Sequence, residues 1–532
     1  MQPDGGRAGI PSPVGANPRL AIRSSVCFCR SLAVVLAIGL AVPLPVAAQR
    51  EQSPTDGQTA RRQAVQRLRE AYPAAARARP VRTLPIGVFD SGTGGLAVLE
   101  EILRLDQFDN AAGAPRTGGD GQPDFADEQF VFLADQANMP YGNYPAAGKR
   151  SLLVELVLQD SLFLLAAARS GGPRPASPVR DQSPVKAIVI GCNTATAYGE
   201  AEVEQLIREA GLDVPVISVI EAGAEATVEA LPLSGEGAVG VLATCGTVAS
   251  GAYPAAIAAA ARQRGHKPAC VVQQGSVGLA GAIDGLPEFV LPQARAGQPR
   301  REYLGPSLAH EQAPIDPALL PRYGFDFSPG RMIWEGTPTR PTALQINSVE
   351  NYVAYETVSL LEKLRTRPDA QPLVAVVLGC THYPYVAQVF HDKLRQLYHY
   401  QEQGRYVYRS VLAPDVSCID PAQHVARRLY AALAAGSKRR LAGDAVSQPT
   451  RGQFYLSVPN RDHPGVQLTP QGGFTQDYKY GRTRTLGIED VQVVPLTPSL
   501  LPGDVAGRLE RRLPECWTLL RDFSADCRGS AQ

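Results

Sequence analysis

Two cysteines stand at matching places in two short segments of this 532-residue chain. Residues 187–194 read AIVIGCNT and residues 375–382 read AVVLGCTH, so in each an apolar run ends in Gly-Cys followed by hydrogen-bonding residues. A thiol at a helix N-terminus lies near unpaired backbone N–H groups and the positive end of the helix dipole, which favour the thiolate. Cys192 and Cys380 are therefore the candidate reactive thiols, although either one alone could be a small strand-end residue.

Two opposed thiols could support three kinds of chemistry. They could form a disulfide, or Cys380 could act with His382 as a Cys–His nucleophile. The third option is two-base proton transfer, in which one thiolate removes a proton from carbon and the opposite thiol returns one to the other face. Equivalent positions in facing halves suit the third option best, because inversion needs a group on each side of the carbon. It also requires one sulfur to be charged and the other protonated.

A third strand end adds polar groups. The segment IGVFDSGTGGLAVL places Asp90, Ser91 and a glycine-rich turn directly after an apolar run. Such a turn can bind phosphate, but this one lacks the lysine of a Walker motif and the full spacing of a dinucleotide fingerprint. Its backbone N–H groups can equally hold a carboxylate. Asp90 could bind a substrate ammonium group or tune a thiol, whereas Tyr141 of the later PYG loop would by itself be an ordinary surface aromatic.

The elements that carry these residues alternate regularly from Leu84 onward. Short apolar runs are followed by stretches with helical patterns, which predicts parallel sheets covered on both faces by helices. Ligands of such sheets bind at the carboxyl ends of the strands. Together with the repeated Gly-Cys segments, the pattern predicts an α/β fold of two similar doubly wound parallel-sheet domains. These domains face each other across an active-site cleft and carry an insertion and a C-terminal extension.

The chain divides into six expected segments. The segment GQFYLSVPN is expected to be a final strand of the first half, and the insertion is rich in proline. The expected order is a signal peptide (1–48), a linker or loose helix (49–84), the first domain (85–217), the second domain (218–384) with its insertion at about 285–349, a return to the first domain (385–460), and the extension (461–532).

The N-terminal segment has the pattern of an export signal. Four arginines precede an apolar run that ends in small residues at Val46, Ala47 and Ala48. This pattern is typical of a secretory signal peptide, and we predict cleavage after Ala48 and a periplasmic or secreted protein. An uncleaved membrane anchor is the alternative, and a cytoplasmic location would follow if the start had been assigned too early.

Charge and cysteine content exclude several classes of function. Lys+Arg 52 against Asp+Glu 51 leaves a net charge of +1, so no basic field attracts nucleic acid. Loss of Cys27 and Cys29 with the signal leaves an odd number of cysteines, so at least one thiol is unpaired. None has the C-x-x-C spacing of a zinc or redox site. Cys516 and Cys527 are the expected disulfide, because they lie close together near the end of the chain.

Five motifs occur in a characteristic order, and together they are far more specific than any one alone. They are DSGTGG at 90–95, PYG at 140–142, GCNTATA at 191–197, GTVASGAY at 246–253 and LGCTHYP at 378–384. Over about Leu84 to Tyr430, the chain closely resembles glutamate racemases of the aspartate/glutamate racemase superfamily.

The resemblance implies cofactor-independent interconversion of L-glutamate and D-glutamate, a peptidoglycan precursor, with no metal or pyridoxal phosphate. Glutamate is then the small-molecule partner, and a homodimer is one option for assembly. By this resemblance, Cys192 takes the proton from the D-isomer and Cys380 takes it from the L-isomer, assisted by Asp90 and His382. The implied substrate-binding residues are Asp90, Ser91, Tyr141, Gly142, Asn193, Thr194, Thr381 and His382.

Some positions depart from the family pattern. Asp284 stands where the family has a glutamate, and its role stays open. Gln136 and Asn138 stand where the family more often has threonine and arginine, a difference that bears on substrate preference. Two alternatives therefore remain: a racemase for aspartate or another amino acid, and an exported non-catalytic protein that binds an acidic amino acid or a partner.

Overall fold

The computed structural model describes residues 61–70, 72, 80–165 and 184–529, apart from residues 233, 235, 268, 295–296, 442–443, 445–450, 487 and 502. The predicted signal peptide lies outside these described residues. Within the described part of the chain, no helix is long and apolar enough to cross a membrane.

The first half is built on a six-stranded sheet with the order β14-β13-β2-β1-β3-β4. The apolar runs at its centre are buried along their whole length, as expected for strands covered on both faces. All neighbouring pairs are parallel except β13 with β14, which forms an antiparallel edge. The strands are β1 (Ile86–Asp90), β2 (Phe130–Ala134), β3 (Ala187–Ile190), β4 (Val216–Ser218), β13 (Gly452–Pro459) and β14 (Val491–Pro495).

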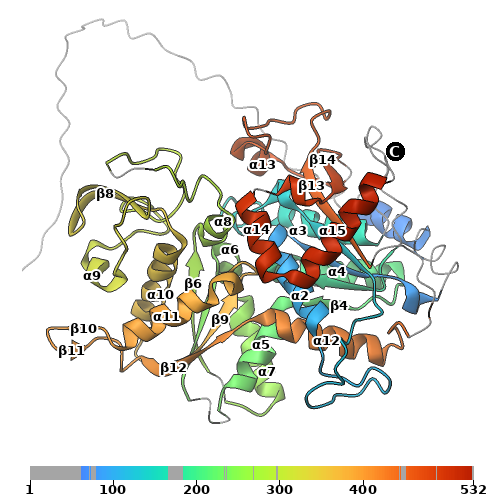
Figure 1. Cartoon of the computed structure of the whole chain (residues 1–532), viewed down its shortest axis with the longest axis horizontal. Coiled ribbons are helices and arrows are strands. Elements are labelled where there is room, and N and C mark those ends of the chain that lie inside the picture. Colours follow the sequence, from blue (N-terminus) through green and yellow to red (C-terminus); the bar gives the residue numbers. More distant parts are fainter. Residues whose placement is uncertain are drawn as a thin grey trace, which may run out of the picture. The chain divides into compact units, whose positions relative to one another are not determined.

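Helices cover both faces of this sheet (Figure 1). The connection from β1 to β2 runs in one direction across the sheet, and those from β2 to β3 and from β3 to β4 run in the other. Right-handed crossovers therefore place the helix of the first connection on one face and the helices of the other two on the opposite face. Helices α3 (Arg150–Leu164) and α4 (Asn193–Ala210) pack against each other, and α2 (Leu96–Arg104) packs against α12 (Pro421–Ala435) and α15 (Pro514–Gly529).

The second half repeats this topology in a four-stranded parallel sheet with the order β12-β9-β5-β6. Its strands are β5 (Ala238–Thr244), β6 (Cys270–Ser276), β9 (Leu373–Gly379) and β12 (Leu412–Ile419). Numbered in chain order within their half and read from the β6 edge, these strands have the order second-first-third-fourth. The β2-β1-β3-β4 part of the first sheet has the same order. The predicted α/β fold with two similar parallel sheets is therefore confirmed.

The helices of the second half form two packed pairs (Figure 1). One pair is α5 (Val219–Ala230) with α7 (Ala252–Gln263), and the other is α10 (Val349–Arg365) with α11 (Ala387–Tyr398). The remaining helices are short or belong to the added segments. They are α6 (Cys245–Ser250), α8 (Leu279–Ile283), α9 (Leu320–Tyr323), α13 (Gln476–Gly481) and α14 (Gly503–Arg512).

The insertion between α8 and α10 carries a small antiparallel hairpin. Strands β7 (Met332–Thr337) and β8 (Arg340–Ile346) pair with each other and belong to neither large sheet. The hydroxyl groups of Tyr303 and Tyr352 lie 3.1 Å apart in the buried contact between the insertion and α10. A separate two-stranded ribbon, β10 (Gln401–Glu402) with β11 (Arg405–Tyr406), precedes β12.

The chain returns to the first sheet later than expected. The sequence placed this return at residue 385, but α11 packs on β12, and β12 pairs in parallel with β9 of the second sheet. The second half needs β12 as its fourth strand, so the return begins only with α12. The segment GQFYLSVPN lies in β13, which pairs with β2.

Part of the predicted linker is a helix packed on the core. Residues 61–70 are helical, and Ala64, Leu68 and Tyr72 are buried at a four-residue spacing that forms one apolar stripe. Arg61 forms ion pairs with Glu202 and Glu209 of α4. The stripe was missed because small and aromatic residues alternate there with arginine and glutamine.

The C-terminal extension is built into the first half. Strand β14 extends the sheet beyond β13, and α15 packs against α2 and β13. Cys516 and Cys527 lie on α15, eleven residues apart and therefore ~16 Å apart along the helix axis. A disulfide needs Cα atoms within about 7 Å, so the pairing expected from the sequence is wrong.

Candidate active site

The two Gly-Cys segments follow strands at equivalent positions of the two sheets. Cys192 comes after β3 and Cys380 after β9, each the third strand of its half in chain order. Side chains also connect the two halves at these strand ends. Thr381 Oγ1 donates to Asp90 Oδ2 at 3.2 Å, and the hydroxyl groups of Thr194 and Thr244 lie 2.9 Å apart. The duplicated topology thus brings the predicted residues to one place.

Cys192 is the N-cap of α4 and is nearly buried. Its Sγ accepts a hydrogen bond from Ala195 N at 3.4 Å and lies 3.5 Å from Ser91 Oγ, which in turn lies 3.4 Å from Asp90 Oδ1. Burial, reinforced by the charge of Asp90, raises the pKa of Cys192 to about 12. The helix N-terminus therefore does not make this thiol a thiolate, contrary to the sequence expectation. Loss of hydration outweighs the N–H donor.

Asp90 joins the two halves from a buried position. Its Oδ1 accepts from Gly92 N at 2.9 Å, and its Oδ2 accepts from Thr381. Burial raises the pKa of Asp90, against the opposing influence of the His382 charge and these hydrogen bonds. A Cβ atom on Gly94 would lie 2.6 Å from His382 Cε1. The glycine-rich turn thus allows the loop after β1 to approach the second half closely.

Cys380 has a different partner from Cys192. Its Sγ lies 3.7 Å from His382 Nδ1, and His382 Nε2 lies 3.0 Å from Asp284 Oδ2. Burial alone would lower the pKa of His382, but the charge and hydrogen bond of Asp284, together with the nearby Cys380, raise it well above its ordinary value. Arg508 of α14 lies 4.0 Å from the other oxygen of Asp284. The residue whose role the sequence left open therefore belongs to the Cys380 side of the site.

The hydroxyl of Tyr141 is bonded to two buried carboxyl groups. Its OH lies 2.5 Å from Asp135 Oδ2 and 2.8 Å from Asp160 Oδ2. One phenol has one proton, so one carboxyl group must be protonated to supply the second bond. Burial and the charge of Asp135 raise the pKa of Asp160 well above its ordinary value, so Asp160 is that group. The hydroxyl of Tyr141 is thus fully engaged, and Tyr141 can offer a ligand only its backbone polar groups.

Asn193 and Thr194 begin α4 and face the second half. Asn193 Oδ1 accepts a hydrogen bond from Tyr253 OH at 2.6 Å, while Asn193 Nδ2 is buried with no partner among the described residues. Thr194 Oγ1 lies 2.9 Å from Thr244 Oγ1 and 3.1 Å from Thr247 Oγ1. Asn193 therefore keeps an amide donor available at the junction of the two halves.

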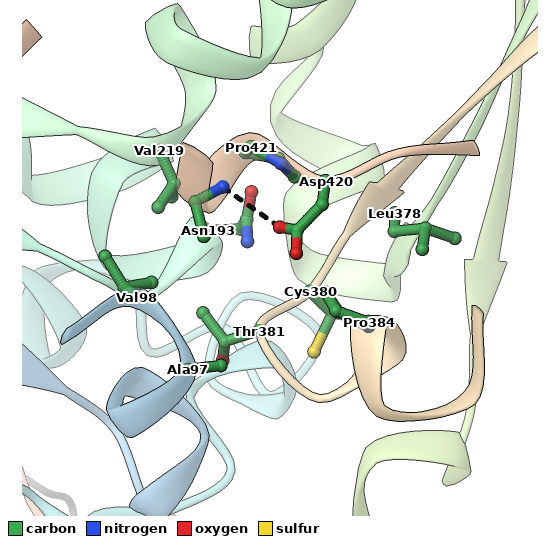
Figure 2. Close-up of a pocket in the computed structure, with 11 residues that line it drawn as sticks. Ala97, Val98, Asn193, Val219, Leu378, Cys380, Thr381, Pro384, Asp420 and Pro421 are labelled. Carbon is green, nitrogen blue, oxygen red and sulfur yellow. Dashed lines mark hydrogen bonds between the residues drawn. The ribbon is translucent and has the colours of Figure 1, made fainter. Parts of the chain in front are cut away.

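A small pocket adjoins Cys380 at this junction. Figure 2 shows Cys380 and Thr381 of the second half around it, together with Asn193 of the first half and Asp420, the N-cap of α12. Burial raises the pKa of Asp420 to about 6. The other lining residues are Ala97, Val98, Val219, Leu378, Pro384, Pro421 and Ala422. Within the part of the chain that the structure describes, no cluster of three His, Cys, Asp or Glu side chains could hold a metal ion.

Several residues of the site were missed from the sequence. Thr247 and Tyr253 both lie in the GTVASGAY motif, so the motif was found but its side chains were given no role. Asp135 directly follows β2, and Asp160 is the one acid among the buried residues of α3, which apart from Asp160 and Ser161 are apolar. A buried acid in an apolar helix face was the signal that could have identified Asp160.

Comparison with known proteins gives matches over part of the chain. No family model matches it. A segment of 177 residues is 37% identical to a glutamate racemase of Levilactobacillus brevis, covering 33% of this chain and 48% of that protein. The resemblance to glutamate racemases is thereby confirmed. A glutamate racemase of Limosilactobacillus fermentum is 35% identical over 173 residues, covering 32% of this chain and 47% of that protein. The chain thus spans about half the length of the glutamate racemases it matches.

Solved structures of glutamate racemases also overlap this chain. The glutamate racemase of Francisella tularensis in complex with D-glutamate has 18% identity and a TM-score of 0.40, covering 76% of this chain and 96% of that chain. A glutamate racemase from Bacillus anthracis has 21% identity and a TM-score of 0.40, with 70% and 88% covered. The α/β fold itself follows from the strand orders of the two sheets.

Proposed function

We propose that this protein interconverts L-glutamate and D-glutamate without a cofactor, using Cys192 and Cys380 as two bases on opposite sides of the substrate. The observation that carries the proposal is the placement of the two thiols after equivalent strands of two half-domains with the same strand order. Similarity to glutamate racemases supports glutamate as the substrate. D-glutamate is a peptidoglycan precursor, and supply of that precursor is the role we propose.

The environments of the two sulfurs support opposite protonation states. Two-base transfer needs one thiolate and one thiol at the start of each turnover. The pKa of Cys192, raised to about 12 by burial, keeps this sulfur protonated at neutral pH. The raised pKa of His382 keeps its ring protonated, and an imidazolium 3.7 Å from Cys380 Sγ stabilises negative charge there. The resting protein is then set to take a proton from the L-isomer.

The reaction follows from these states. The Cys380 thiolate takes the α-proton of L-glutamate, and the electron pair left on carbon spreads into the α-carboxylate. The Cys192 thiol then gives its proton to the opposite face, which forms D-glutamate and leaves a thiolate at Cys192. The Ala195 N–H and the Ser91 hydroxyl are the donors beside that thiolate. Proton exchange with solvent then returns Cys192 to the thiol and Cys380 to the thiolate. The reverse reaction starts from the Cys192 thiolate and D-glutamate.

The remaining predicted residues would hold the substrate carboxylates with neutral donors. Asn193 Nδ2 is buried without a partner among the described residues, so a ligand oxygen would relieve the cost of its burial. The backbone of Tyr141 and Gly142 borders Thr244, where a Cβ atom on Gly142 would lie 2.9 Å from Thr244 Cβ. A site this closely packed excludes water, and dry, fixed donors stabilise charge that develops during proton removal.

The test is racemisation of L-glutamate and of D-glutamate by the purified, reduced protein without added cofactor, followed by circular dichroism, with D-aspartate in parallel. In D₂O, early product should carry deuterium at the α-carbon while recovered substrate keeps protium, because a separate group protonates each face. Deuterium in both pools would contradict the two-base mechanism. Failure of a folded, reduced protein to racemise any acidic amino acid would overturn the function. Calorimetric binding of glutamate in that case would favour the non-catalytic alternative.

A further inference from the structure

The C-terminal extension contacts the loop that carries Tyr141 and Gly142. The contact is made by Arg482, which follows α13 and has a side chain only 6% exposed. Its Nη2 donates to Asn138 Oδ1 at 2.6 Å and to Tyr144 OH at 3.2 Å. One guanidinium group therefore binds the loop on both sides of Tyr141 and Gly142.

The guanidinium group of Arg482 is itself firmly held. Its Nη1 pairs with Asp490 Oδ2 at 2.9 Å, and its Nε donates to Lys479 O at 3.2 Å. The group also lies over the rings of Phe474 and Tyr478, at 4.9 Å and 5.7 Å from their centres. A planar cation that is stacked and paired in this way has little freedom to move away from the loop.

A second cation of the extension reaches the same loop. Lys479 Nζ donates to Met139 O at 2.5 Å, and Lys149, at the other end of the loop, donates to Arg482 O at 3.2 Å. Burial lowers the pKa of Lys479 to about 8. The extension and the loop are thus joined by donors from both segments.

Arg482 also acts on the loop through Asp135. Asn138 Nδ2 donates to both oxygens of Asp135 at 3.0 Å, and the Asp135 carboxylate accepts from Tyr141 OH. Burial raises the pKa of Asp135, and the positive charge of Arg482 opposes that rise. Arg482 therefore holds the Asn138 amide in place and favours the ionised carboxylate on which Tyr141 depends.

We propose that Arg482 is a positioning residue of this active site and that the extension is consequently part of the substrate-binding machinery. By fixing Asn138 and Tyr144, it holds the backbone of Tyr141 and Gly142 where the substrate meets it. This inference rests on the proposed racemase function. Arg482 touches neither thiol, so its removal weakens substrate binding more than it slows proton transfer.

The test compares Arg482→Met and Arg482→Lys with a matched control, Arg484→Met, at an exposed arginine two residues further on. Hydrogen bonds to a charged group contribute about 1.5–3 kcal/mol, so we expect Arg482→Met to raise KM for glutamate about tenfold to a hundredfold, with a smaller change in kcat. Lysine keeps the charge but cannot reproduce the planar fork, so the KM of Arg482→Lys should lie between those of the parent protein and Arg482→Met. Arg484→Met should match the parent protein.

Amide hydrogen exchange supplies a readout that needs no turnover. In Arg482→Met, the amides of residues 137–139 and 141–144 should exchange about tenfold faster or more, while those of β1 and α4 keep their rates. Unchanged exchange, or faster exchange with an unchanged KM, would overturn the proposal. If Arg482→Met does not fold, Asn138→Ala and Tyr144→Phe remove its two acceptors one at a time and should give the same KM and exchange changes. If the parent protein has no racemase activity, the proposed function fails, and exchange alone decides whether Arg482 orders the loop.

Discussion

The two halves share a strand order, yet they place different groups beside their thiols. In the first half, α4 begins directly at Cys192, so the sulfur meets a backbone N–H group and the Ser91 hydroxyl. In the second half, the 3₁₀ turn η6 (Tyr383–Val386) starts three residues after Cys380, and the sulfur meets the ring of His382 instead. The duplicated scaffold places the two sulfurs at equivalent strand ends, and the few residues after each strand give the sulfurs different neighbours.

A second pair of equivalent positions shows the same division. Helix α3 follows β2 and carries the buried Asp160, while α10 follows β6 and carries the fully buried Glu356. Burial raises the pKa of Glu356 to about 7, and Gln274 Nε2 donates to it at 2.7 Å. Each half therefore places a buried acid on a helix that lies between its second and third strands. Asp160 is hydrogen-bonded to Tyr141, whereas Glu356 accepts from Gln274.

Replacing each cysteine by serine in turn is the strongest test of the difference between the two halves. Cys192→Ser and Cys380→Ser should each lower the rate of inversion by about a thousandfold or more, because each removes one acid-base group. Cys192→Ser should still exchange the α-hydrogen of L-glutamate in D₂O, since the Cys380 thiolate remains, and Cys380→Ser should exchange only D-glutamate. Mass spectrometry of recovered substrate measures both. Cys418→Ser, in β12, is the control, and a variant that exchanges both isomers equally would break the assignment of sides.

Removing the carboxylate of Asp284, which contacts His382, should change how kcat depends on pH through the Cys380 side of the site alone. Without Asp284, the largest influence that opposes burial is lost, so the pKa of His382 falls from its raised value. The imidazolium is then lost at a lower pH than in the parent protein. Asp284→Asn should therefore lose about tenfold to a hundredfold in kcat at pH 8 and regain activity towards pH 6.

The measurement is kcat from pH 6 to 9 with L-glutamate. Asp415→Asn, whose side chain is 95% exposed in the same half, is the matched control and should follow the parent profile. If kcat depends on pH in the same way in Asp284→Asn and in the parent protein, His382 does not assist Cys380 through its charge.

Replacing the threonines that form hydrogen bonds between the two halves should have the smallest effects. Thr381→Val leaves the buried Asp90 with one donor fewer, and Thr244→Val removes a bond between neutral hydroxyl groups. We expect losses of about 1–2 kcal/mol and about 1 kcal/mol in the free energy of unfolding, respectively. Denaturation in urea measures both, and a larger loss for Thr244→Val would show that the Asp90 contact is not the stronger link.

The sequence predicts much of the scaffold because strands buried on both faces are continuous apolar runs. Residues 187–190 and 373–379 are such runs, and the residues after them are the ones that the structure brings together. Strand β12 was missed as part of the second sheet because it lies at an edge and is only partly buried, which gives no apolar run. The boundary error at residue 385 follows from that.

Protonation states and long-range contacts could not be predicted from local patterns. The neutral thiol of Cys192 results from burial by both halves, which a helix N-terminus in the sequence does not show. Arg482 contacts Asn138 across 344 positions of the chain, and no spacing rule connects them. The hydroxyl of Tyr141 is likewise directed by Asp135 and Asp160, which depends on side-chain packing between a loop and α3.

The late return of the chain to the first sheet also affects how the molecule is made. A chain leaving the ribosome completes β1 to β4, then the whole second half, and only afterwards supplies β13 to cover the edge of β2. During that interval the first sheet has an open, apolar edge, which is a site where nascent chains can join wrongly. The second half is continuous from β5 to β12, so all four of its strands are available before β13 is made. The sheet that carries Cys380 can therefore be complete before the sheet that carries Cys192, the reverse of the order in which the two thiols are synthesised.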